Sequence, residues 1–134
     1  MCSSDLPAPD KDAKWIRGRY LAEALAHCQE CHTPRTLTGG LDSAKAFSGN
    51  PSGPDGKGIP NITPDPTGIG EWSESDLAFA LKTGITPDGD TFGSFMADVV
   101  EYGTSYLSDD DRAAMAHYLK SMPPIRRVSS NGGP

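Results

Sequence analysis

The sequence lacks the features on which several function classes depend. It contains no apolar run close to the roughly eighteen residues needed to cross a bilayer, so we expect no membrane span. Lys and Arg number 12 against 18 Asp and Glu, which gives a net charge of -6. Nucleic-acid binding relies on clustered positive charge, so a nucleic-acid partner is not expected.

The chain is also short and poor in apolar side chains. Its 134 residues fit a single domain with one modest core. Apolar residues make up 36 % and aromatic residues 7 %, and the chain has 12 prolines and 15 glycines. This composition is compatible with a core that a large apolar cofactor completes.

The N-terminus has no basic start followed by an apolar stretch, as a secretory signal would. Its first letters, MCSSDL, resemble translated adapter sequence, so we interpret residues 1–6 as an artefact that replaces a lost signal. Lipidation of Cys2 is the alternative. We expect residues 1–12 to be disordered, residues 13–124 to form the domain, and residues 125–134 to be a mobile tail or linker.

Helical periodicity predicts an all-α fold of about four short helices joined by long loops. Apolar residues recur on one face over 13–30, which predicts a first helix. Ser73 with Asp76 resembles a capping box, and Gly84 can end the helix that follows. A short helical segment is expected over 97–102. A last helix is predicted to begin after Ser108 and to stop before Pro123.

The string HCQECH at residues 27–32 places two cysteines about one helical turn apart. A zinc site would need further paired ligands, and the chain offers only Cys2, His27 and His117. A thiol–disulfide site expects its CxxC beside a strand, and few strand-like runs occur nearby. Both readings are weak alternatives.

Covalent haem attachment explains this spacing better. The sulfurs of Cys28 and Cys31 can bond the two vinyl groups on one edge of a porphyrin. His32 follows directly and is then placed beneath the iron as its proximal ligand. The sequence therefore predicts one covalently bound haem c.

Together with this motif, PNIT at 60–63, WSESDLAFAL at 72–81 and MAHYLKSMPP at 115–124 resemble the class I cytochromes c in this order. The resemblance covers residues 16–124. It is strongest to the cytochrome subunits and domains of periplasmic alcohol and sugar-acid dehydrogenases. It implies the class I cytochrome c fold, wrapped around one haem.

The resemblance also implies roles for individual residues. The Pro60 carbonyl would accept a hydrogen bond from His32, and Ile62 would pack on the ring. Trp72 would lie near a propionate, with Leu77 and Leu81 against the porphyrin. In the last helix, Met115 and Tyr118 would cross the first helix near Gly18 and Tyr20.

Arg35 is either a propionate ligand or a solvated loop charge. Met115 and Met122 lie on the apolar face of the last helix and are interpreted as core residues. The resemblance implies that Met96 is delivered from a loop as the sixth iron ligand. Ala97 follows it where relatives often have a proline, so the loop that carries the methionine is expected to be less rigid.

These assignments predict an electron-transfer protein rather than an enzyme. The expected partners are a dehydrogenase, another cytochrome or a terminal oxidase, with the chain a monomer or a subunit of a complex. The resemblance implies a periplasmic location. The alternative is a haem enzyme with a labile sixth ligand that acts on peroxide or a small inorganic donor.

Overall fold

The computed structural model describes residues 12–50 and 58–126, without side-chain detail at positions 94 and 95. Contacts divide the chain into two units. The helical unit comprises residues 1–26 and 72–118, and the loop unit comprises residues 27–71 and 119–134. The expectations for residues 1–12 and 125–134 fall almost entirely outside the described residues.

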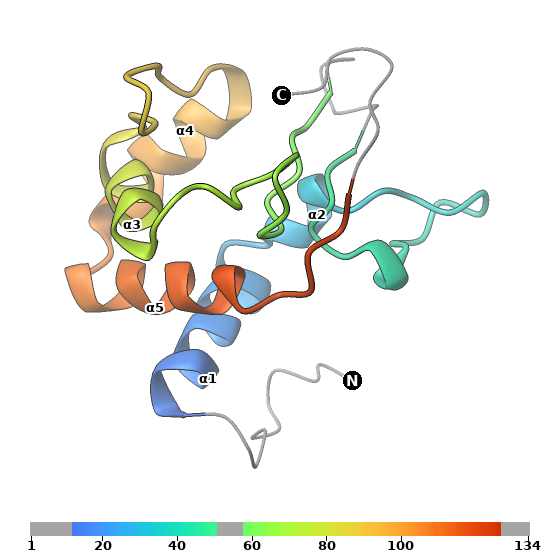
Figure 1. Ribbon diagram of the computed structural model, residues 1–134, viewed down its shortest axis with the longest axis horizontal. Helices are drawn as coiled ribbons and strands as arrows, with labels where there is room; N and C mark the ends of the chain where they lie inside the picture. Colours follow the sequence, from blue (N-terminus) through green and yellow to red (C-terminus); the bar gives the residue numbers. More distant parts are fainter. Residues whose placement is uncertain (1–11, 51–57, 127–134) are drawn as a thin grey trace. The chain divides into compact units, whose positions relative to one another are not determined.

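The regular secondary structure of the described residues is helical. These residues contain no β-strand and only three isolated β-bridges. This confirms the predicted all-α class (Figure 1). The α-helices are α1 (Ala13–Arg19), α2 (Cys28–His32), α3 (Glu74–Thr83), α4 (Ser94–Tyr102) and α5 (Asp109–Lys120). Short helices of other types are η2 (Tyr20–Leu25, a π-helix), η3 (Ser43–Lys45) and η4 (Thr104–Tyr106).

The single helix predicted over 13–30 is wrong. After α1 the chain widens into the π-helix η2, in which the N–H of Ala26 donates to the carbonyl of Leu21 at 2.8 Å. His27 then adopts a left-handed conformation with φ 55°, and α2 begins as a separate helix. Ala, Leu and Glu are good helix formers, so the break has no local signal in the sequence and follows from tertiary structure.

In the helical unit, α1 crosses α5 at Gly18, as the resemblance implied. A Cβ on Gly18 would lie 1.9 Å from the carbonyl oxygen of Ala114, so only glycine allows this approach. The ring of Trp15 meets Tyr118 edge-on, with centroids 5.1 Å apart, and the Tyr118 hydroxyl donates to Glu23. Aromatic pairs favour this geometry, so the crossing is fixed by packing and by a polar contact.

Helix α3 has the ends that the sequence predicted. Ser73 accepts the N–H of Asp76 at 2.9 Å, and Asp76 accepts the N–H of Ser73 at 3.0 Å, which is a complete capping box. Gly84 ends the helix with φ 77°, a left-handed conformation that costs glycine little. The buried face of the helix carries Leu77, Ala80 and Leu81.

Arg112 of α5 has a buried side chain that organises the segment after α4. Its guanidinium donates to the carbonyls of Thr104, Ser105 and Leu107. The Thr104 hydroxyl in turn donates to the carbonyl of Leu81 at 2.5 Å. These bonds satisfy buried carbonyls and tie η4 to both α3 and α5.

Candidate functional site

Helix α2 carries the cysteine pair in the loop unit. Cys28 and Cys31 are separated by three positions on one helical turn, and both side chains are partly exposed. Neither takes part in a disulfide within the described part of the chain. Their spacing and exposure suit covalent attachment to one edge of a planar group.

His32 ends α2 and is 8 % exposed. Its Nδ1 lies 2.9 Å from the carbonyl oxygen of Pro60, so the contact that the resemblance implied is present. Burial lowers the pKa of the imidazole, and the hydrogen bond to Pro60 raises it less. The ring is therefore neutral with its proton on Nδ1, which leaves the lone pair of Nε2 for a metal.

The loop that carries Pro60 is tied to an earlier loop by backbone bonds. Ile62, which is partly exposed, donates its N–H to the carbonyl of Phe47 at 2.8 Å. Phe47 has φ 67°, an uncommon conformation for a bulky residue, and its N–H donates to the Thr33 hydroxyl at 3.0 Å. Sequence reasoning assigned no role to Thr33 or Phe47, because their contact joins positions that lie 14 residues apart in loops.

Buried apolar side chains are few in the described part of the loop unit. They are Phe47, Ile69 and Leu119, whereas the described part of the helical unit buries ten, from Leu21 to Tyr118. Among the described residues of the loop unit, the buried polar ones are His32, Thr33, Ser48, Asn61 and Thr63. A unit with a neutral buried imidazole, a cysteine pair and little apolar core fits a large apolar group bonded to it.

Met96 belongs to the helical unit and is partly exposed. The expectation that it lies in a loop is wrong, because α4 begins at Ser94 and Met96 stands in its first turn. Of the other residues predicted to contact haem, Trp72 is partly exposed just before α3. Leu77 and Leu81 are buried on α3.

Arg35 is exposed and holds its own loop together. Its guanidinium donates to the carbonyl of Gly39 at 3.2 Å, to that of Glu30 at 3.2 Å, and to the Glu30 carboxylate at 3.3 Å. These contacts match the reading of Arg35 as a solvated loop charge. A bond to a propionate stays a prediction.

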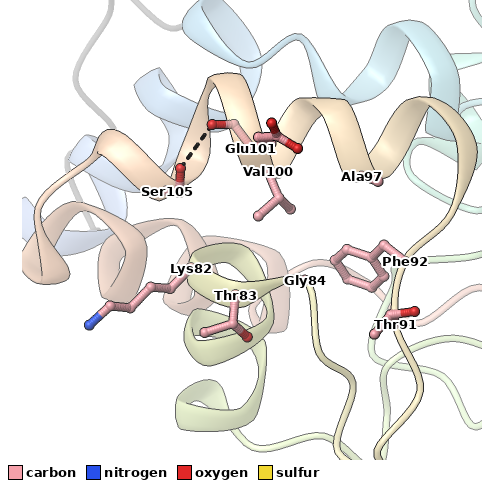
Figure 2. Close-up of a pocket in the computed structure, with 9 residues that line it drawn as sticks. All are labelled: Lys82, Thr83, Gly84, Thr91, Phe92, Ala97, Val100, Glu101 and Ser105. Carbon is pink, nitrogen blue, oxygen red and sulfur yellow. Dashed lines mark hydrogen bonds between the residues drawn. The ribbon is translucent and has the colours of Figure 1, made fainter.

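The helical unit has a surface cavity of about 340 Å³ beside the C-terminal end of α3. Figure 2 shows Val100 pointing from α4 toward α3 and Phe92 pointing into the same space, while Lys82 extends away from it. The remaining lining residues are Thr83, Gly84, Thr91, Ala97, Glu101 and Ser105. None of these nine described residues was predicted to contact haem.

Two features are absent from the described residues. No group of three or more His, Cys, Asp or Glu side chains there is arranged to hold a metal ion. Within the same residues, no helix combines the length and apolarity that crossing a membrane requires.

A family model described as Cytochrome c matches residues 16–123. The chain is 50 % identical over 119 residues to a diheme cytochrome c-type protein of Cereibacter sphaeroides, covering 88 % of this chain and 37 % of that protein. It is 43 % identical over 123 residues to the gluconate 2-dehydrogenase cytochrome c subunit of Pantoea cypripedii, covering 87 % and 28 %.

The chain is also 44 % identical over 110 residues to the fructose dehydrogenase cytochrome subunit of Gluconobacter japonicus, covering 81 % and 22 %. It thus spans well under half the length of each of these curated relatives.

Proposed function

Because the chain belongs to the cytochrome c family, we propose that it carries one covalent haem c and transfers single electrons, without being an enzyme itself. The observation that carries this proposal is the CQECH segment, in which two cysteines on one turn precede a buried histidine bonded to Pro60. When bound, haem iron supplies a one-electron ferrous–ferric couple. The chain has one such motif, which supports one haem for these 134 residues.

Attachment and the first axial ligand are assigned to the loop unit. Cys28 and Cys31 supply the thioether sulfurs, and His32 supplies Nε2. The Pro60 carbonyl accepts the Nδ1 proton, which fixes the tautomer and orients the ring. Ile62 is proposed to pack on the ring system. Burial of His32 keeps its imidazole neutral and so able to bind a metal.

Met96 is proposed as the second axial ligand. Support comes from its partial exposure at the start of α4. Met115, by contrast, is 0 % exposed in the core, as expected for a packing residue. A thioether ligand favours the ferrous state and raises the potential, which suits an electron acceptor. Trp72, Leu77 and Leu81 of the same unit are proposed to contact the haem.

The proposed electron donor is a dehydrogenase or another haem, and the proposed acceptor is another cytochrome or a terminal oxidase. The gluconate and fructose dehydrogenase cytochrome subunits among the relatives support this role. A periplasmic location is proposed on the same ground. The contact with a partner is proposed to be small and weak, so that partners separate quickly.

An absorption spectrum of the purified protein before and after denaturation tests the proposal. We expect a low-spin spectrum with the weak far-red band of sulfur–iron ligation, and pigment that stays with the denatured chain. Colourless denatured protein would contradict covalent attachment. A high-spin spectrum would contradict ligation by Met96 and favour a haem enzyme instead.

Changing Met96 to Ala tests the sixth ligand directly. The variant should lose the far-red band, bind carbon monoxide and show a lower reduction potential, because the thioether is gone. Met122→Ala is the matched control, since it removes a partly exposed thioether that follows α5. Unchanged spectra in the Met96 variant would rule this residue out.

A further inference from the structure

The residue after Pro60 has a side chain whose polar atoms are all engaged. Asn61 is 2 % exposed. Its amide nitrogen donates to the Thr67 hydroxyl at 3.0 Å and to the backbone carbonyl of Ile125 at 2.7 Å. Its amide oxygen accepts the N–H of Thr63 at 2.8 Å and the Thr63 hydroxyl at 2.7 Å. This amide therefore joins its own loop to the segment that follows α5.

The same segment makes a second bond to the loop. The N–H of Ile125 donates to the Thr63 hydroxyl at 3.1 Å, so both backbone groups of Ile125 are engaged. The last turn of α5 adds to this, because Lys120 donates to the carbonyls of Ile69 and Gly70 at 3.0 and 3.2 Å. These contacts lie within the loop unit.

Gly68 packs closely against the backbone of this loop. A Cβ on Gly68 would lie 2.4 Å from the carbonyl oxygen of Thr63 and 2.9 Å from that of Asn61. The Thr63 carbonyl also accepts the N–H of Ile69 at 2.9 Å. The close approach of Gly68 and the hydrogen bonds to Ile125 together hold the backbone at position 61, and with it the neighbouring carbonyl of Pro60.

We infer that Asn61 is a positioning residue that couples the segment after α5 to the proximal histidine. It holds the Pro60 carbonyl at hydrogen-bond distance from His32 Nδ1, and this bond sets how strongly the imidazole donates electrons. Outer partners of a metal-binding histidine fix its orientation and raise its basicity. The inference rests on the proposed function, in which His32 ligates iron.

The direction in which the reduction potential should change follows from the electron density on the His32 imidazole. A strong bond from Nδ1–H to a carbonyl makes the imidazole electron-rich and favours ferric iron. Loosening the loop weakens that bond and should favour the ferrous state. The potential should therefore rise when Asn61 loses its contacts.

Two variants of Asn61 test the coupling. Asn61→Ala removes every side-chain contact, while Asn61→Asp keeps an acceptor for Thr63 but loses both N–H donors. We expect the His32 Nδ1–H of the ferrous protein to exchange about tenfold faster by NMR. At a fixed ambient potential, the ferrous-to-ferric ratio should rise about threefold.

Three further variants separate this role from a general loss of stability. Ser73→Ala removes the cap of α3 in the other unit, and Ile125→Ala keeps the backbone groups that Asn61 and Thr63 use. Both should leave the Nδ1–H exchange and the potential unchanged. Thr63→Val preserves volume but removes the hydroxyl bonded to Asn61 and Ile125, and it should shift both readouts in the direction of Asn61→Ala.

The coupling would be overturned if the Asn61 variants lost stability, as Ser73→Ala does, while the Nδ1–H exchange rate and the reduction potential stayed at wild-type values. If the Asn61 variants do not fold, the same result for Thr63→Val would overturn it. A wild-type protein without haem, or with His32 not bound to iron, would instead overturn the proposed function before any variant is compared.

Discussion

At the scale of single residues, Gly18 and Gly68 are the two described glycines that other backbone atoms approach most closely. Gly18 lies against the carbonyl of Ala114, and Gly68 lies against the carbonyl of Thr63. In both cases the obstructing atom belongs to backbone, which cannot rotate away as a side chain can. A single methyl group at either position must move a whole segment.

Gly18→Ala should therefore be strongly destabilising. The added methyl would meet the Ala114 carbonyl at 1.9 Å and force α1 away from α5. We expect a loss of about 3 kcal/mol in the free energy of unfolding, measured with urea. Gly40→Ala is the control, because its Cβ would meet only the Thr36 hydroxyl at 3.7 Å. Equal losses in the two variants would contradict this account of the crossing.

At the scale of elements, α1 and α5 are joined by charge as well as by packing. Arg17 donates to the two carboxylate oxygens of Asp111 at 3.0 and 3.2 Å. The hydrogen bond from Arg17 holds the pKa of Asp111 below its ordinary value of 3.8. The pair thus stabilises the folded state only while Asp111 is ionised.

The direction of this pKa shift determines how the stability difference between wild type and Asp111→Asn depends on pH. The folded-state pKa of Asp111 lies below the unfolded one, so its contribution is complete above the unfolded pKa and is lost as pH falls through the folded pKa. The difference in unfolding free energy between wild type and Asp111→Asn should be constant near neutral pH. It should shrink below pH 3.8 and then vanish.

Asp110→Asn provides the comparison, since it removes an equal charge from the same turn of α5 without touching Arg17. Its stability difference from wild type should be smaller at neutral pH. If this difference matched that of Asp111→Asn at every pH, the Arg17–Asp111 pair would make no specific contribution to the free energy of unfolding.

At the scale of the whole molecule, the two units differ in what they bury. The helical unit has its own apolar core, whereas the described part of the loop unit buries mainly hydrogen-bonded polar side chains. Polar groups that are buried and paired contribute little net stability compared with apolar burial. The loop unit is therefore the part of the fold that we expect to depend on haem attachment.

Replacing both Cys28 and Cys31 by Ser tests this dependence. Without attachment, folding loses the free energy that a bound group supplies, as in small metal domains. Hydrogen exchange should rise across residues 27–71, while α3 and the α1–α5 crossing keep more of their protection. A colourless double variant with wild-type protection throughout would contradict this expectation.

Features with a local signal could be predicted from the sequence. The ends of α3 follow from Ser73, Asp76 and Gly84, which lie on or beside the helix they bound. Features that depend on distant partners could not be predicted. The role inferred for Asn61 rests on Ile125, which is 64 positions away, and the break at His27 has no propensity signal. Met96 was assigned to a loop because the helical segment was expected over 97–102, whereas α4 begins three residues earlier at Ser94, where no side chain caps the helix.

The π-helix η2 has a consequence for relatives of different length. A π-helical turn accommodates one residue more than an α-helical turn does. A homologue that is shorter by one residue between positions 20 and 25 would therefore hold an ordinary α-helix there. Variation of chain length within η2 is therefore compatible with an unaltered CQECH segment in α2.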